Sequence, residues 1–569
     1  MFIDARTIPD NQVLETDVCI IGAGAAGITL AREFIDRPFR VSMLESGDFE
    51  YNQETQSLYE GENVGLPYYP LQASRLRYFG GTTNHWGGTC RPFDDFDFEK
   101  RDWIPYSGWP IRRSDLEPYY DRARTICQLS SAEWDTSYWQ ERDKSPALPS
   151  LGDQIVSRLA QIVPTHLRSF GKNFRDEILQ AQNIITYLNA NVTEIETDDT
   201  AQTVSGVRVA CLAGNQFSIT AKIFVLAVGG IENPRLLLLS NKRQPNGLGN
   251  QNGLVGRFFL EHPRFEAGII LPSNPHTRTD FYEPHLVGNS KITGYLSLSE
   301  ETRRREELVD VQIKLRPVYE ETYVKAAGSK DVASLRYLVK AFRGRKSINN
   351  FDKHAANVVR DMMSWQKLII PGAPTLTPDP MVIAQITESG LSGLEPLVSE
   401  YLGDIALFAY GKIFNNIPIQ GIRLLTRIEP VPNPESRVTL STERDRLGQN
   451  RVRLDWRLSP LDKRSVIRTL EILGAEAGRA GFGRLQIKID DDDTTWPADI
   501  RGGWHHMGTT RMSDDPRQGV VDGNCQMHGI SNLFVAGSSV FPTPGSGTPT
   551  LTLTALALRL ADHIKGRMK

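Results

Sequence analysis

Cysteine is scarce in this chain of 569 residues, and no two cysteines are spaced as a CxxC pair. A disulfide framework is therefore not expected, and neither is a metal site built on thiolates. We interpret the five thiols as isolated and buried. They belong to Cys19, Cys90, Cys127, Cys211 and Cys525. No histidine or acidic residues at ligand spacing replace them, so no metal is predicted.

Long apolar runs are missing as well. No stretch is continuously apolar over the roughly 18 residues that a transmembrane helix requires, and residues 1–6 do not begin a signal peptide. We therefore expect a soluble, cytoplasmic protein that does not associate with membranes. The formal net charge of -3 at pH 7 provides no excess of basic residues, so nucleic-acid binding is not predicted. Because 569 residues exceed one ordinary core, two or three domains or one discontinuous pair are expected, and the oligomeric state stays open.

A glycine turn between an expected strand and an expected helix is the first informative stretch. Residues 17–21 form an apolar run of strand length, a GxGxxG pattern follows, and helical spacing begins at Ile28. Dinucleotide-binding sites require this context, because the glycines permit a tight turn, close approach of a pyrophosphate and helix–strand packing. A second strand, 40–44, ends at a carboxylate placed to bind the adenosine ribose. The expected contacts are Gly22, Gly24, Ala26, Gly27, Glu45 and Ser46; a purely structural turn is the alternative.

Residues 75–90 form a second glycine-rich loop. Its core, 80–88, combines four glycines with two threonines, an asparagine and a histidine. The glycines let the backbone approach a planar ligand closely, and the polar side chains can satisfy ring heteroatoms. A glycine-rich surface turn is the alternative for this loop taken alone.

Several stretches resemble the GMC (glucose–methanol–choline) oxidoreductases. Residues 80–88 resemble the family's flavin-contacting loop, and residues 103–111 resemble its bacterial sugar-oxidising branch, related to pyranose oxidase. Residues 221–238 are similar to its second signature, and residues 254–263 to its crossing into the substrate domain. The resemblance covers nearly the whole chain. It implies an α/β fold in which a Rossmann-like FAD-binding domain of the p-hydroxybenzoate hydroxylase type joins a substrate domain of antiparallel sheet and helices.

The resemblance also implies where FAD is held. Flavin or adenine contacts are expected at Gly81, Thr82, Asn84, His85, Trp86, Gly87, Val192, Ala227, Gly537, Ser538, Pro549 and Thr550. In pyranose oxidases the histidine of this loop carries the flavin covalently, and it maps onto His85. The alternative is a histidine that only packs against the ring or hydrogen-bonds it. A helix expected over 549–565 would direct its N–H groups and dipole toward the flavin N1–C2=O edge.

Two adjacent histidines lie in residues 504–512, in a His-x-x-Gly-Thr pattern. The pattern resembles the GMC catalytic motif and implies that His505 is the general base. An alcohol C–H leaves as hydride to flavin N5 only if the hydroxyl proton also departs, and imidazole is an efficient acceptor. His506 and His262 are expected to be structural. Where relatives carry a second catalytic His or Asn, this chain has Thr548, whose hydroxyl can orient a substrate but cannot act as a base.

We therefore predict FAD-dependent oxidation of a hydroxyl group on a sugar, glycoside or polyol, with oxygen, a quinone or a protein as the external electron acceptor. The predicted domains are a first FAD-binding part at 1–265, a substrate domain at 266–490 and a second FAD-binding part at 491–569. Within the substrate domain, 329–416 is a helical insert, interpreted as a lid or oligomer contact in preference to a membrane-surface or partner-binding segment.

Two alternatives stay open because of Thr548. One is oxidation of a non-sugar alcohol in a biosynthetic pathway. The other is a flavin-binding protein without redox activity, such as a lyase, an isomerase or an inactive subunit. A nicotinamide enzyme is disfavoured because a second GxGxxG unit is missing.

Overall fold

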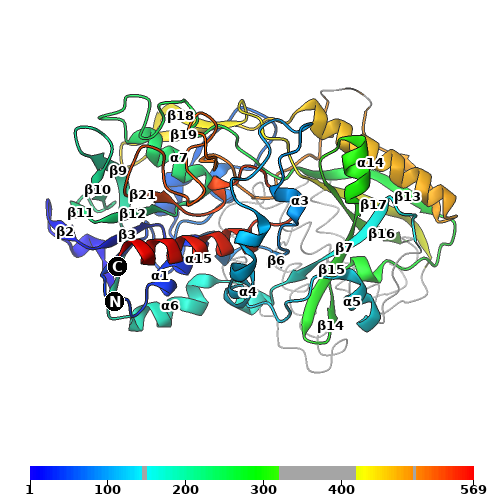
Figure 1. Cartoon of the computed structure of the whole chain (residues 1–569), viewed down its shortest axis with the longest axis horizontal. Helices are drawn as coiled ribbons and strands as arrows, with labels where there is room; N and C mark the ends of the chain where they lie inside the picture. The colour runs from blue at the N-terminus through cyan, green and yellow to red at the C-terminus, as the bar shows by residue number, and fades with distance from the viewer. Residues whose placement is uncertain (144–149, 320–417, 491, 493–494) are drawn as a thin grey trace, which may run out of the picture.

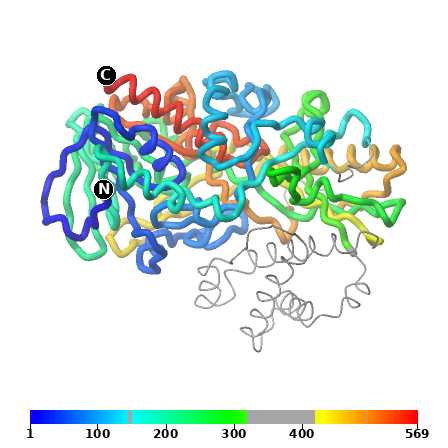
Figure 2. The backbone as a smooth tube through the Cα atoms, turned by 90° about the horizontal axis from the view of Figure 1, so that it is seen from below, coloured from blue at the N-terminus to red at the C-terminus, as the bar shows by residue number. Residues whose placement is uncertain are grey.

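The computed structural model describes residues 1–143, 150–319, 418–490, 492 and 495–569. Its first large element is a six-stranded sheet in the order β1-β8-β4-β3-β12-β21, in which every neighbouring pair is parallel. The strands are β1 (Phe2–Asp4), β3 (Val18–Ile21), β4 (Val41–Leu44), β8 (Ile184–Leu188), β12 (Ile223–Leu226) and β21 (Leu533–Val535). Segments from both ends of the chain therefore build one sheet, and both termini lie in this half of the molecule (Figures 1 and 2).

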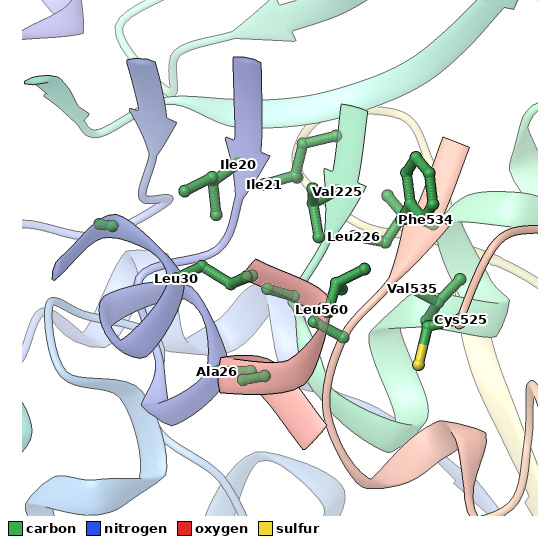
Figure 3. Packing of buried hydrophobic residues seen from close by; sticks show 14 of the residues in the cluster. Ile20, Ile21, Ala26, Leu30, Val225, Leu226, Cys525, Phe534, Val535 and Leu560 are labelled. Atoms are coloured by element: carbon green, nitrogen blue, oxygen red, sulfur yellow. The ribbon is translucent and has the colours of Figure 1, made fainter. Parts of the chain in front are cut away.

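Helices cover this sheet. The long C-terminal helix α15 (Thr550–Arg567) packs against α1 (Ala25–Glu33) and α4 (Glu117–Ile126), and α1 also contacts α6 (Phe170–Gln180). Figure 3 shows Leu30 of α1 and Leu560 of α15 in one buried cluster with apolar side chains of β3, β12 and β21. The strands β3, β4 and β12 are buried throughout and apolar except at Ser42, as expected for a parallel sheet covered on its faces.

A small four-stranded sheet adjoins the parallel one. It has the order β2-β11-β10-β9, with β2 (Val13–Glu15), β11 (Gln216–Thr220), β10 (Val204–Ala210) and β9 (Asn191–Thr197). The helix α7 (Gly229–Leu239), which follows β12, packs against β9 and against β18 of a three-stranded sheet. That third sheet contains β18 (Arg437–Arg444), β19 (Asn450–Asp455) and β5 (Gly61–Asn63).

An antiparallel sheet forms the other half of the molecule. Its order is β20-β13-β17-β16-β15-β7-β6, and β14 pairs with β15. The strands are β6 (Thr89–Cys90), β7 (Ile155–Ile162), β13 (Arg264–Pro272), β14 (His285–Val287), β15 (Ser290–Leu298), β16 (Val311–Tyr319), β17 (Ile419–Ile428) and β20 (Gly483–Ile487). One apolar cluster joins this sheet to α14 (Pro460–Arg479), which lies along it in Figure 1. The shorter helices are α2 (Gln53–Gln56), α3 (Asp95–Phe98), α5 (Thr136–Arg142) and α8 (Glu300–Glu306).

The predicted fold class is confirmed: a parallel sheet covered by helices stands beside an antiparallel sheet with helices. The predicted domain boundaries stay a prediction. Within the first predicted segment, 1–265, the structure places β6 and β7 in the antiparallel sheet. The predicted helical insert at 329–416 lies outside the described residues.

All five cysteines are buried, and none forms a disulfide. Within the part of the chain that the structure describes, no helix combines the length and the apolarity needed to cross a bilayer.

Candidate active site

The turn between β3 and α1 has the geometry of a nucleotide site. Gly22 has a φ of 106°, and a Cβ placed there would lie 2.6 Å from the Ala227 carbonyl oxygen. A Cβ on Gly27 would lie 1.9 Å from the Gly22 oxygen, so helix and strand could not pack as they do. Beside Gly24, in contrast, no atom lies within 4 Å of an added Cβ. The space therefore opens at the glycine where the helix begins, and α1 has no side-chain cap there.

Glu45 lies at the end of β4, next to this turn, and only 5% of it is exposed. Its carboxylate accepts hydrogen bonds from the backbone N–H groups of Ala23 (3.1 Å) and Gly47 (2.9 Å). Burial raises the pKa of this carboxyl group, and the backbone donors oppose that effect. Ser46 follows in the chain and adds a third backbone donor to the carboxylate. This position beside the glycine turn suits a group that receives ribose hydroxyls.

The second glycine-rich loop touches the first. The Gly80 N–H donates to the Ala23 carbonyl oxygen at 2.9 Å, and a Cβ on Gly81 would lie 3.1 Å from the Cα of Gly24. A 3-10 turn, Gly81–Asn84, contains Thr82 and leads to His85. Two predicted contacts brace the loop: the Asn84 amide donates to the Phe79 carbonyl, and the Trp86 indole donates to the Arg168 carbonyl. The backbones of the two glycine-rich loops thus lie against each other. No atom lies within 4 Å of a Cβ added to Gly87, so the space beside it is open.

His85 has the clearest unsatisfied atom of this loop. Its imidazole stacks on the Trp504 indole, with ring centroids 5.0 Å apart and planes 23° apart. The Nε2 atom is buried and has no hydrogen-bond partner among the described residues. Burial lowers the pKa of His85 to about 4, so the ring is neutral at pH 7. Trp504 has a φ of 61°, a strained conformation for a bulky residue of the kind that concentrates at functional sites.

His505 contacts a histidine from another part of the chain. Its Nδ1 lies 2.7 Å from the Nδ1 of His262, whose Nε2 lies 2.7 Å from the Gly545 carbonyl oxygen. His262 is fully buried, and the two rings are nearly perpendicular at 89°. Burial first, and then the neighbouring His262 and Arg427, hold the pKa of His505 well below its usual value. The other ring nitrogen of His505 forms no hydrogen bond with the described residues.

Glu261 fixes the backbone around the two adjacent histidines. Its buried carboxylate accepts from the backbone N–H groups of Gly503 (2.9 Å) and His505 (3.0 Å). The Tyr68 hydroxyl donates to the same carboxylate at 2.5 Å and lies 2.8 Å from the Nε2 of His506. The ring of His506 is thus tied to Tyr68, and burial lowers its pKa to about 3.

The C-terminal segment closes the site. Gly537 has a φ of 107°, and a Cβ placed there would lie 4.0 Å from the Cβ of Ala26 in α1. The Ser538 hydroxyl donates to the His506 carbonyl oxygen at 2.8 Å. Further along, α15 begins at Thr550 with Pro549 as its N-cap. These contacts place Gly537 beside α1 and Ser538 on the backbone of His506.

Thr548 precedes α15 and is buried. Its hydroxyl donates to the Thr89 carbonyl oxygen at 2.5 Å. A hydroxyl has one proton, so this bond leaves Thr548 able only to accept from a substrate. Val192 lies in β9, the end strand of the four-stranded sheet, and the Ala227 N–H donates to the Ile21 carbonyl at 2.8 Å.

The residues present fit FAD. Open space beside the glycine that begins α1, the bare helix N-terminus and the unpartnered Nε2 of His85 are three features that a dinucleotide with a flavin ring would satisfy. The sequence did not predict the roles of His262, Glu261 and Tyr68. His262 lies in a stretch that the sequence does single out, but its contact with His505 spans 243 positions and leaves no local pattern.

Comparison with known proteins extends these observations. The family model for GMC oxidoreductase matches residues 432–557. The chain is 24% identical to the 2-methyl-1,2-propanediol dehydrogenase of Mycolicibacterium austroafricanum, over 97% of this chain and 96% of that protein. It is 23% identical to the fructose dehydrogenase large subunit of Gluconobacter japonicus (98% and 99% covered). It is 22% identical to the paromamine 6'-oxidase of Streptomyces fradiae (97% and 91% covered). Residues 432–557 thus match the GMC oxidoreductase model, and the chain is similar along almost its whole length to these three relatives.

Proposed function

We propose that this protein oxidises a CH–OH group of a sugar, glycoside or polyol, with FAD as its resident cofactor and His505 as the general base. One observation carries the proposal: His505 is held by its backbone N–H and by one ring nitrogen, and its other ring nitrogen has no partner among the described residues. The relatives support the substrate class, because their names give a diol, fructose and paromamine as substrates.

Most of the proposed site residues would bind FAD, and His505 would transfer the proton. Gly22, Gly24, Ala26, Gly27, Glu45 and Ser46 would hold the adenosine and pyrophosphate, together with Val192 and Ala227. The flavin would lie against Gly81, Thr82, Asn84, His85, Trp86, Gly87, Gly537, Ser538, Pro549 and Thr550. When bound, FAD supplies the acceptor for the hydride of the carbinol C–H bond.

His505 takes the hydroxyl proton in this scheme. Its lowered pKa keeps the imidazole neutral at pH 7, so the lone pair is available without prior deprotonation. Thr548 accepts a hydrogen bond from the substrate, since its own proton is committed to Thr89. We further propose the domain division 1–265, 266–490 and 491–569, and we leave oxygen, a quinone and a protein as candidate electron acceptors.

A second candidate is oxidation of a small non-sugar alcohol. The name of the Mycolicibacterium relative, which aligns over 97% of this chain, gives a branched diol and not a sugar as its substrate. This candidate uses the same site and the same base, so one experiment separates the two.

The experiment is anaerobic reduction of the purified, FAD-loaded protein, followed by the visible flavin band. Sugars, glycosides, polyols and small diols are added one at a time. Bleaching by a sugar or polyol supports the proposal, and bleaching only by small diols or simple alcohols supports the second candidate. A flavin that stays oxidised with every alcohol would overturn both.

Substitution of His505 tests the base. His505→Ala should slow flavin reduction by about 10²- to 10⁴-fold, the usual contribution of a general base. His276→Ala is the matched control, because His276 is exposed in the structure, and it should reduce at the wild-type rate. A His505→Ala protein that reduces as fast as the control would exclude His505 as the base.

A further inference from the structure

We propose that His262 is the positioning residue of this site: it accepts a hydrogen bond from Nδ1–H of His505 and thereby leaves Nε2 of His505 as the proton acceptor. The inference rests on the proposed function, which it deepens by assigning the reacting nitrogen. It gives a role to a residue that the sequence alone marks as structural.

The hydrogen bonds fix the tautomers in one order. A carbonyl oxygen can only accept, so the His262 Nε2 that lies 2.7 Å from the Gly545 oxygen must carry a proton. A neutral imidazole has one N–H, so the Nδ1 of His262 is then an acceptor. The Nδ1 of His505, 2.7 Å away, must donate to it. His505 is therefore protonated at Nδ1 and bare at Nε2.

The only other arrangement requires a charged His262, with His505 accepting at Nδ1. The surroundings oppose it. His262 is fully buried, and burial together with the Arg427 and Arg264 guanidinium groups lowers its pKa to about 3. The carboxylate of the neighbouring Glu261 faces away, onto the Tyr68 hydroxyl and the backbone of Gly503 and His505. His262 is thus neutral at pH 7.

Glu261 and His262 hold different parts of His505. The Glu261 carboxylate binds the backbone N–H at 3.0 Å, and the next residue in the chain binds the ring. The pair of adjacent residues in the 254–263 segment therefore sets both the position and the tautomer of the base.

A neutral partner has a consequence that a carboxylate partner would not. It orients the imidazole but adds no negative charge to stabilise the imidazolium form. His262, Arg427, Arg264 and His506 all lower the pKa of His505, and the Glu261 carboxylate binds its backbone N–H and not its ring. Flavin reduction should therefore stay fast as the pH falls through 6.5, the ordinary pKa of histidine.

Three variants test the assignment on the FAD-loaded protein. His262→Phe keeps a ring of similar size but removes the acceptor, and it should slow flavin reduction by about 100-fold, with little change in the substrate concentration for half-saturation. His262→Asp and His262→Asn restore an oxygen near the former Nδ1 and should recover most of the rate. The Asp variant should also move the acidic limb of the pH–rate profile upward, because its charge favours the imidazolium. Flavin content and melting temperature identify any variant that fails to fold.

A second measurement does not depend on turnover. Nitrogen-15 spectra of the wild-type protein labelled at histidine, assigned with His505→Ala and His262→Phe, report which ring nitrogens carry protons. Protonated Nδ1 on His505 and protonated Nε2 on His262 are expected. A His505 protonated at Nε2, or a folded His262→Phe protein with the wild-type rate and pH profile, would overturn the inference. If no alcohol reduces the wild-type flavin, the proposed function fails, and the spectra still decide the tautomer.

Discussion

At the scale of single residues, the buried ring nitrogen of His85 leads to a prediction that can be tested chemically. Its Nε2 is buried without a hydrogen bond among the described residues, and its lowered pKa of about 4 keeps the ring neutral at pH 7. We therefore expect that His85 carries the flavin covalently. Acid precipitation of the wild-type protein should leave the yellow colour in the pellet, whereas His85→Ala should release it to the supernatant. Release of the flavin from the wild-type protein would leave His85 with a packing role only.

Thr548 offers a second residue-scale prediction. Because its hydroxyl is buried and donates to the Thr89 carbonyl, Thr548→Val removes a hydrogen bond while keeping the shape of the side chain. We expect the free energy of unfolding to fall by about 1 kcal/mol. Thr548→Ser retains the hydroxyl and is the matched control. Equal thermal stability of the Val and Ser variants would mean that the bond to Thr89 contributes nothing.

The same pair of variants also reports on the substrate. If Thr548 accepts a hydrogen bond from the substrate hydroxyl, the Val variant should need a higher substrate concentration for half-maximal flavin reduction, and the Ser variant should not. No difference between the two would confine Thr548 to its structural bond.

At the scale of elements, two helical glycines have opposite surroundings. A Cβ on Gly230, in the first turn of α7, would lie 2.2 Å from the carbonyl oxygen of His506. On Gly478, near the end of α14, it would meet no atom within 4 Å. Gly230→Ala should therefore displace the histidine segment, lower the melting temperature and slow flavin reduction. Gly478→Ala should raise stability by about 0.5–1 kcal/mol, since alanine favours helix over glycine.

Thermal unfolding and flavin reduction of both alanine variants check this contrast. The Gly478→Ala protein is also the control for reduction, because α14 lies on the antiparallel sheet, and its rate should equal that of the wild type. A Gly230→Ala protein with wild-type stability and rate would show that α7 and residues 504–512 can move apart without loss of folding stability.

Elements with a local signal could be predicted from the sequence. The apolar runs before Gly22 and Gly229 appear as β3 and β12, and the helix expected after Pro549 is α15. In these cases the pattern, the turn and the length all depend on neighbouring residues. The place of β7 was not predictable in this way, because its partners β6 and β15 lie far away in the sequence. A strand's sequence does not encode which sheet it joins.

At the scale of the whole molecule, the candidate site combines segments from both chain ends. The glycine turn, the loop at 80–88 and the residues from 503 onward meet because the last strand, β21, pairs with β12 in the parallel sheet. Family resemblance predicted that these segments converge. It did not predict which side chains meet within the site: His505 with His262, and His506 with Tyr68, are contacts that depend on tertiary packing alone.

A buried ion pair joins two segments that lie far apart in the sequence. Arg101, from a segment before residue 265, donates to Glu429 at the end of β17 through two bonds of 3.0 and 2.5 Å. The two side chains are 0% and 1% exposed, so neither charge can turn to water if its partner is lost. Glu429→Gln should therefore remove the carboxylate that is bonded to the buried guanidinium and lower stability by about 3–5 kcal/mol.

The Arg304–Glu300 pair is the matched control for this prediction. Its bond is 2.7 Å long, but its side chains are 42% and 50% exposed, so the Glu300→Gln change should cost less than about 1 kcal/mol. Thermal unfolding of the two FAD-loaded variants should thus give a large drop for Glu429→Gln and almost none for Glu300→Gln. Similar drops would mean that water or another acceptor reaches Arg101. In that case apolar packing, and not this charge, would hold the segment around Arg101 against the end of β17.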